Sequence, residues 1–216
     1  MDVTKIEAAV ERLERNLPIR RNQTRLDEPL RQLHRRILRH YLERGVARAD
    51  GDPDGFGDWQ GGVDRLAAEQ IIVVDETGSI IGAYPFVEEA REFRVVTRFG
   101  AVNAMCAFDA LAVSSMFEIP TRVESRCRLS GRAIVIEQNR ADIRVAEPGE
   151  PVFAAIDWNA AGGTGSCALN LCTEMIFIAG DARAAEWCGE DTDKRELFAL
   201  PEAHAIIAQI FMPLMR

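Results

Sequence analysis

Short runs of strand-like sequence separated by turns fill the second half of the chain, and they limit the folds it can adopt. These runs are REFRVVTRF, TRVESRC, RAIVIEQ, ADIRVA, EPVFAAIDW and TEMIFIA. The second and third flank the turn Leu129-Ser130-Gly131, which is typical of a hairpin of antiparallel strands. Expected helices at 104–117, capped by Asn103, at 181–187 and at 201–212 interrupt or follow the strands. The pattern predicts a mainly antiparallel sheet with flanking helices.

The first part of the chain has a different, helical pattern. Residues 4–15 carry apolar residues at helical spacing, and 27–45 form one apolar stripe with Asp27 suited to cap its start and Gly45 its end. A loop at 51–62 and a short helix at 63–70 lead to a hairpin that turns at Thr77 and Gly78. The fold class is therefore expected to be α+β. We expect residues 1–85 to form a winged-helix-like N-terminal unit and residues 86–216 to form an α+β domain that carries the candidate site residues described below.

Charge and cysteine usage exclude some classes of protein. The formal net charge of −8 disfavours a general nucleic-acid binder, which needs a cationic surface. No apolar run is long enough to span a membrane and the N-terminus is charged, so we expect a cytoplasmic protein. The five cysteines are odd in number and lack a CxxC pair, which favours free thiols, and only three histidines are present. Chemistry in this chain is expected to depend on thiols and carboxylates.

One apolar stretch, NAMCAFDAL, holds a thiol and a carboxylate three residues apart. If this stretch is helical, Cys106 and Asp109 lie on the same face, one turn apart. The first turn of a helix favours the thiolate of Cys106, and a thiolate selects soft metals. Apolar neighbours should raise the pKa of Asp109 toward that of a working general acid.

The same pattern has an unremarkable interpretation. A buried cysteine is more often a small apolar side chain than a reactive group. Asp109 could be a solvated residue on the outer face of an amphipathic helix. From the spacing alone, the functional and the structural interpretation are about equally supported.

The stretch from Gly82 to Trp187 resembles the organomercurial lyases, also called alkylmercury lyases. The matching segments, in family order, are GAYPF at 82–86, CAFDALA at 106–112, RVESRCRLSG at 122–131, RVAEP at 144–148 and CTEMIFIAGDARAAEW at 172–187. Together they cover about half of the chain. A CxxD followed by a Cys-x-Leu-Ser-Gly hairpin and then by a cysteine that leads a strand is a specific combination.

The resemblance implies a role for each matching residue. It implies that Cys106 and Cys172 bind mercury as thiolates, that Asp109 donates the proton, and that Cys127 is structural. The chain departs from the family at two positions beside the site. Met105 stands where members commonly have tryptophan, and Thr173 stands where some have a second cysteine.

The resemblance also implies a reaction. Two sulfurs make the mercury-bound carbon basic, and Asp109 returns a thiol proton to it, which releases the hydrocarbon and leaves Hg(II) on the cysteines. Met105, Phe108 and Phe177 are expected to line the apolar substrate pocket. No permanently bound cofactor is expected. External thiols are needed for turnover, and a cellular thiol or a mercuric reductase accepts the Hg(II) product. The resemblance indicates no role for Cys167 or Cys188, and a monomer and a homodimer are both compatible with it.

Two other classes of protein compete with a lyase. A winged-helix metal-responsive regulator could use the basic side of the second long helix, formed by Arg31, Arg35, Arg36 and Arg39, although the same arginines suit a solvated face. A non-catalytic metal-thiolate protein could hold a soft metal on Cys106, Cys127 and Cys172. Asp109 separates the classes, because a passive soft-metal site gains little from a carboxylate.

Overall fold

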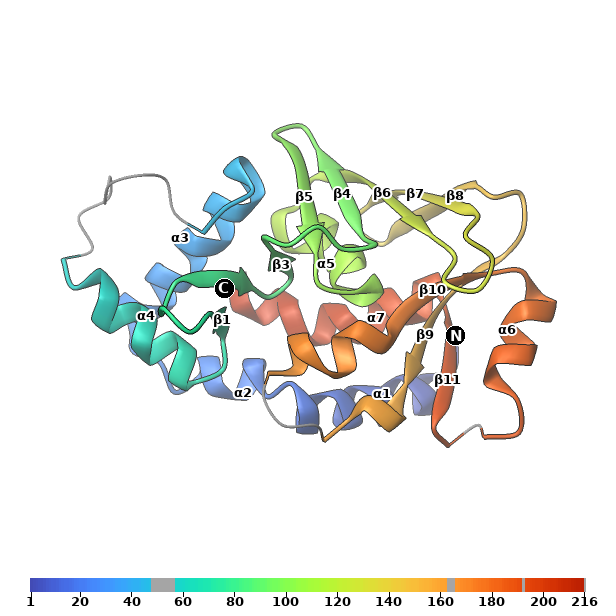
Figure 1. Ribbon diagram of the computed structural model, residues 1–216, viewed down its shortest axis with the longest axis horizontal. Coiled ribbons are helices and arrows are strands. Elements are labelled where there is room, and N and C mark those ends of the chain that lie inside the picture. Colours follow the sequence, from blue (N-terminus) through green and yellow to red (C-terminus); the bar gives the residue numbers. More distant parts are fainter. Residues whose placement is uncertain (48–56, 163–165, 192, 216) are drawn as a thin grey trace.

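A computed structural model describes residues 1–47, 57–162, 166–191 and 193–215 of the chain, and it shows an α+β fold (Figure 1). The α-helices are α1 Val3–Asn16, α2 Ile19–Gln23, α3 Glu28–Arg44, α4 Trp59–Ala68, α5 Ala107–Phe117, α6 Asp181–Cys188 and α7 Leu200–Phe211. Short 3-10 turns are η1 Trp158–Ala160, η2 Cys167–Leu169, η3 Leu171–Glu174 and η4 Met212–Met215. None of the helices in these residues is long and apolar enough to cross a membrane.

The strands form two antiparallel sheets. Eight strands make the large sheet in the order β1-β2-β3-β5-β4-β6-β7-β8, and three make the small one in the order β10-β9-β11. Their bounds are β1 Ile72–Val74, β2 Ile80–Ala83, β3 Phe86–Val87, β4 Arg94–Thr97, β5 Gly100–Ala104, β6 Pro120–Arg126, β7 Ala133–Asn139, β8 Asp142–Glu147, β9 Val152–Asp157, β10 Met175–Ala179 and β11 Arg195–Ala199. The predicted α+β class with antiparallel strands is confirmed.

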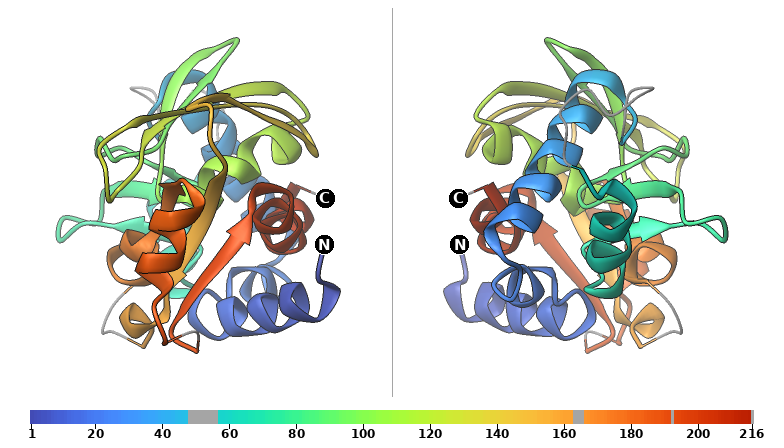
Figure 2. Two further views of the ribbon diagram at one scale, coloured as in Figure 1. Left: turned by 90° about the vertical axis from the view of Figure 1, so that its right-hand side faces the viewer. Right: turned by 90° about the vertical axis from the view of Figure 1, so that its left-hand side faces the viewer.

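Helices α5 and α7 form the centre of the fold. Helix α5 is buried along nearly its whole length, and it contacts α7 and strands of both sheets. Helix α1 packs on the other side of α7, as the views in Figure 2 show. A helix buried on all sides needs apolar residues all round, which explains why every residue from Ala107 to Val113 except one is apolar. Asp109 lies within this buried stretch.

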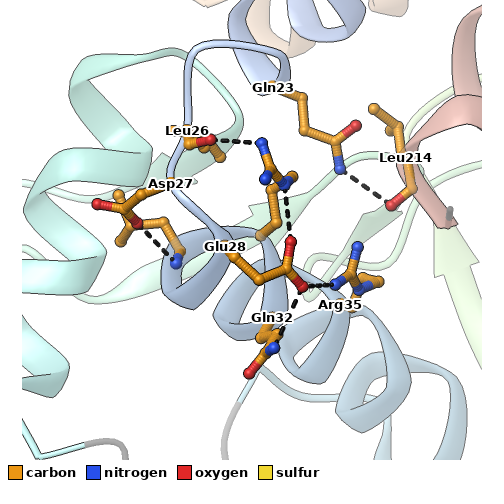
Figure 3. A network of polar contacts seen from close by, with 9 residues as sticks. Gln23, Leu26, Asp27, Glu28, Gln32, Arg35 and Leu214 are labelled. Carbon is orange, nitrogen blue, oxygen red and sulfur yellow. Dashed lines mark hydrogen bonds and ion pairs between the residues drawn. The ribbon is translucent and has the colours of Figure 1, made fainter.

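The second long helix begins and ends where its caps predict. The Asp27 carboxylate accepts the backbone N–H of Leu30 at 3.1 Å, and Gly45 ends α3 with a φ of 77°. The first turn also carries a polar cluster in which Glu28 accepts from Gln32 and Arg35, while Gln23 of α2 donates to the Leu214 carbonyl at 2.9 Å (Figure 3). The contact of Gln23 with Leu214 joins α2 to the C-terminal end of the fold.

Two predicted helix starts were wrong, and some strands were not expected. The short helix starts at Trp59 rather than at residue 63, because Asp58 caps it by accepting from the Gly61 N–H. Helix α5 starts at Ala107, and Asn103 is not its cap, because Asn103 belongs to β5 and pairs there with β3 and β4. The strands β5 and β11 were not expected. Part of the predicted loop, 51–56, lies outside the described residues.

The N-terminal part joins the large sheet directly. The hairpin of β1 and β2 pairs with β3 through Gly82 and Ala83, and β3 pairs with β5. The expected boundary at residue 85 therefore lies between two paired strands, and the division into two domains stays a prediction. The pairing sets the GAYPF segment beside the start of α5.

Candidate active site

The two cysteines and the carboxylate that the sequence singled out lie together in the core. The two sulfurs and a carboxylate oxygen of Cys106, Asp109 and Cys172 are all within 4.8 Å of one another. Each residue is 1–2% exposed. Cys106 follows β5 of the large sheet and Cys172 precedes β10 of the small sheet, so the site lies where the two sheets meet through α5.

Cys106 is the N-cap of α5. Its backbone is extended, with φ −153° and ψ 178°, and its sulfur accepts the backbone N–H of Asp109 at 3.3 Å. A serine or threonine oxygen ordinarily makes this contact. The cap fixes the sulfur at the start of the helix and places the Asp109 side chain above it. The Cys106 thiol in turn donates to the Asp109 carboxylate at 2.8 Å.

Burial keeps all three groups protonated more readily than in water. Burial raises the pKa of Asp109 to about 7, against the opposing effects of the Cys106 hydrogen bond and of the Arg91 charge. Burial also raises the pKa of Cys106 to about 12, so the expected depression by the helix N-terminus is overcome by the loss of solvation. Hydrogen bonds with Cys106 and Cys167, together with burial, raise the pKa of Cys172. Both sulfurs are thiols in the free protein.

Cys172 lies on a 3-10 turn rather than on a strand. The turn η3 ends at Glu174 and β10 begins at Met175, so Cys172 precedes the strand by three residues. Its sulfur lies 3.6 Å from that of Cys167 in the preceding turn η2. The sequence indicated no role for Cys167, and its neighbourhood becomes visible only when η2 and η3 fold against each other.

The remaining predicted site residues are buried near these turns or on the elements that carry them. Met105 packs its methyl group against Gly82, where an added Cβ would lie 2.7 Å away. The Phe108 ring packs edge-on against Phe198, with 5.9 Å between the ring centroids. The Phe177 ring packs edge-on against Phe93, with 5.7 Å between the centroids. Their role in binding the organic group of a substrate stays a prediction.

Cys127 and Cys188 lie in other environments. The Cys127 sulfur accepts the backbone N–H of Ala179 at 3.4 Å, which joins the β6–β7 hairpin to the end of β10. The Cys188 thiol donates to the Arg195 carbonyl at 3.2 Å near the end of α6. Neither sulfur belongs to the cluster of three ligand atoms.

Two residues that sequence reasoning did not single out brace the site. The Tyr84 hydroxyl lies 2.9 Å from Ser166 Oγ and accepts the backbone N–H of Ala168 at 2.9 Å. Arg91 donates to the carbonyls of Met105 at 3.2 Å and Ala168 at 3.0 Å. Arg91 thus joins the segment before Cys106 to the turn η2, which contains Cys167. The GAYPF segment carried the available signal for Tyr84, whereas Arg91 had none.

Comparisons with known proteins identify a family and a similar fold. Residues 86–212, more than half of the chain, match the family model described as alkylmercury lyase, MerB. Among solved structures, the fold is similar to the crystal structure of the mercury-bound form of MerB2, with a TM-score of 0.66 and 17% sequence identity over 89% of this chain and 95% of that chain. No curated protein sequence matches the chain significantly.

Proposed function

The chain belongs to the alkylmercury lyase family, and we propose that Cys106, Asp109 and Cys172 are the groups that cleave its substrate. The reaction of the family is protonolysis of the carbon–mercury bond of R–Hg–X, which gives the hydrocarbon RH and Hg(II). The observation that carries the assignment is the contact of the Cys106 thiol with a buried carboxylate whose pKa is about 7. Such a carboxylate can both accept and donate a proton near neutral pH.

The proposed order of proton transfers rests on the hydrogen bond between Cys106 and Asp109. One thiol, Cys172, replaces X on mercury and its proton leaves as HX. Cys106 joins the mercury next and passes its proton to Asp109, which already accepts a hydrogen bond from it. With two sulfurs bound, the carbon becomes basic enough to take that proton from Asp109. The carbon–mercury bond breaks, RH leaves, and Hg(II) stays on the two thiolates.

The buried position of the site has two consequences for this chemistry. Water is excluded, so the proton on Asp109 is held for the carbon rather than exchanged with solvent. The raised pKa values also mean that both sulfurs lose their protons only as mercury binds, because metal binding and thiol deprotonation are coupled. Phe108, Phe177 and Met105 are the proposed apolar wall for the R group.

Turnover needs an acceptor for the product. We propose that external thiols, or a mercuric reductase, remove Hg(II) from the protein and that no permanently bound cofactor takes part. The five free cysteines suit a reducing compartment, which supports the cytoplasm as the place of the reaction.

The N-terminal part is proposed to be a winged-helix-like scaffold rather than a DNA reader. Arg31 and Arg35 on the basic side of α3 both pair with Glu28, which lowers the positive charge that DNA could meet. A passive metal store is disfavoured by Asp109, since a carboxylate with this pKa adds proton transfer and little affinity for a soft metal.

Headspace gas chromatography tests the assignment. Purified protein is mixed with methylmercury and excess thiol, and methane is measured. Cys106→Ser and Cys172→Ser should abolish methane, whereas Cys188→Ser, a matched change of a thiol outside the cluster, should leave its rate nearly unchanged. Asp109→Ala should still bind the mercurial and yet release no hydrocarbon. Methane at the normal rate from Asp109→Ala would exclude Asp109 as the proton donor.

A further inference from the structure

A third thiol extends the site toward the surface. The Cys167 sulfur lies 3.6 Å from that of Cys172, which is itself within 4.8 Å of the Cys106 sulfur. Cys106 and Cys172 are fully buried, whereas Cys167 is half-buried. The Cys172 sulfur is therefore close to a buried sulfur, that of Cys106, and to the sulfur of a residue that is only half-buried, Cys167.

The position of Cys167 is held by contacts on both sides of it. The residue before it, Ser166, is bonded to the Tyr84 hydroxyl, and the residue after it, Ala168, gives its N–H to the same hydroxyl. The carbonyl of Ala168 accepts from Arg91. A turn fixed by two side chains from outside it holds its sulfur in a defined place beside Cys172.

Release of the product is the step that needs such a group. Hg(II) held by two sulfurs that are 1–2% exposed cannot be reached directly by a thiol in solution. Thiolates exchange on mercury by adding a new sulfur before an old one leaves. The sulfur of Cys167 contacts that of Cys172 and belongs to a residue that is only half-buried, so it can begin this exchange inside the protein.

We propose that Cys167 is the exit ligand, which takes Hg(II) from Cys106 and presents it to external thiols. This inference rests on the proposed function. Cys167 loses its proton as its sulfur bonds to mercury, the bond from mercury to Cys106 breaks, and the Cys106 sulfur takes up a proton. Mercury remains Hg(II), now on Cys167 and Cys172, and the protons balance. Two external thiols then replace Cys167 and Cys172 on mercury in turn, and the proton of each incoming thiol goes to the cysteine sulfur that it displaces. Hg(II) leaves as a complex with the two external thiolates, and the buried pair is free for the next substrate.

The test uses Cys167→Ser with Cys188→Ser as the matched control, since Cys188 is also a half-buried thiol. Each full-length protein is loaded with one equivalent of mercuric chloride, so that loading does not depend on lyase chemistry. A small dithiol is then added, and transfer of Hg(II) is followed by stopped flow. Transfer from Cys167→Ser should be slower by about tenfold, as for loss of a group that supports a metal site, while transfer from Cys188→Ser matches the unchanged protein.

A spectroscopic readout separates a ligand from a structural residue. The sulfur-to-mercury charge-transfer absorption should differ between the unchanged protein and Cys167→Ser, and a residue that only packs would not alter it. Cys167→Ala is the second variant if the serine form folds poorly. Equal transfer rates for the Cys167 variants and Cys188→Ser would overturn the proposal. Slow transfer from Cys167→Ser together with no methane from the unchanged protein and methylmercury would instead refute the lyase assignment and leave the exit site standing.

Discussion

The Cys106 thiol donates to the Asp109 carboxylate at 2.8 Å while its sulfur accepts the Asp109 backbone N–H at 3.3 Å. One residue pair thus forms both the cap of α5 and the proton-transfer contact. Because the cap is part of a helix buried on nearly all sides, the carboxylate cannot turn toward solvent. Folding of the helix and placement of the acid are the same event.

Replacing Asp109 by asparagine should stabilise the protein at alkaline pH. The pKa of Asp109 rises from 3.8 to about 7 on folding, so the folded state holds a proton that the unfolded chain has lost between these values. Stability of the unchanged protein therefore falls as pH rises from about 4 to about 7, by up to about 4 kcal/mol. Asp109→Asn lacks this loss and should be more stable at about pH 8 by about 2–4 kcal/mol, with little difference near pH 4.5.

Urea unfolding at the two pH values measures this difference. Glu118→Gln at the exposed end of α5 is the control for removal of a carboxylate, and a surface ion pair such as Glu118 with Arg140 should contribute less than about 1 kcal/mol. If Asp109→Asn gains no stability at alkaline pH, burial does not raise the pKa of Asp109 in the folded protein.

The rate of hydrocarbon release should depend on the protonation of Asp109. The carboxylate must be ionised to take the Cys106 proton, so kcat/KM should rise with pH through about 7 and then level off. Measurements from about pH 5.5 to about pH 9 need a constant concentration of external thiolate, because the thiol acceptor itself titrates. A rate that falls over this interval would contradict carboxylate as the initial proton acceptor.

Tyr84→Phe should slow the release of Hg(II) several-fold while it lowers the stability of the fold only slightly. The change removes the hydroxyl that holds Ser166 and Ala168, at a cost of about 1 kcal/mol for a hydrogen bond. The backbone N–H of Ala168 then keeps only its 3.2 Å contact with Ser166 Oγ. The turn that carries Cys167 then loosens, and Hg(II) transfer should slow several-fold. Tyr41→Phe is the matched control, since its hydroxyl contacts Glu88 and not these turns. Equal effects of the two changes on transfer would exclude a positioning role for Tyr84.

Local signals in the sequence predicted local structure well. The cap residues and apolar stripe of α3 are all within one segment, and the structure has the helix as expected. The start of α5 was placed too early because asparagine is a strong cap. In the structure Asn103 belongs to β5 and pairs with β3 and β4, and Cys106 caps the helix instead. A local preference lost here to the pairing of strands.

The convergence of the site depended on contacts that no local pattern shows. Cys106 follows a strand of the large sheet and Cys172 precedes a strand of the small sheet, and only the resemblance to a family predicted that they meet. Cys167 and Arg91 had no signal, since their importance arises from turns and carbonyls brought together by the fold. The predicted direction of the Cys106 pKa shift was wrong for a related reason. Burial depends on tertiary packing, and its effect on the pKa outweighs that of the helix N-terminus.

Arg91→Gln should move the pH dependence of the reaction to higher pH. The Arg91 charge lowers the pKa of Asp109 against the larger effect of burial, so removing it lets the pKa rise above about 7. The rising part of the kcat/KM profile should shift upward with it, and activity at neutral pH should fall while the plateau is approached at alkaline pH. Loss of the two carbonyl contacts alone would lower the plateau without shifting the profile. Arg94→Gln is the matched control. Arg94 lies three positions after Arg91 and forms an exposed ion pair with Glu124, so its loss should leave the midpoint unchanged. An unshifted midpoint in Arg91→Gln would show that this charge does not act on Asp109.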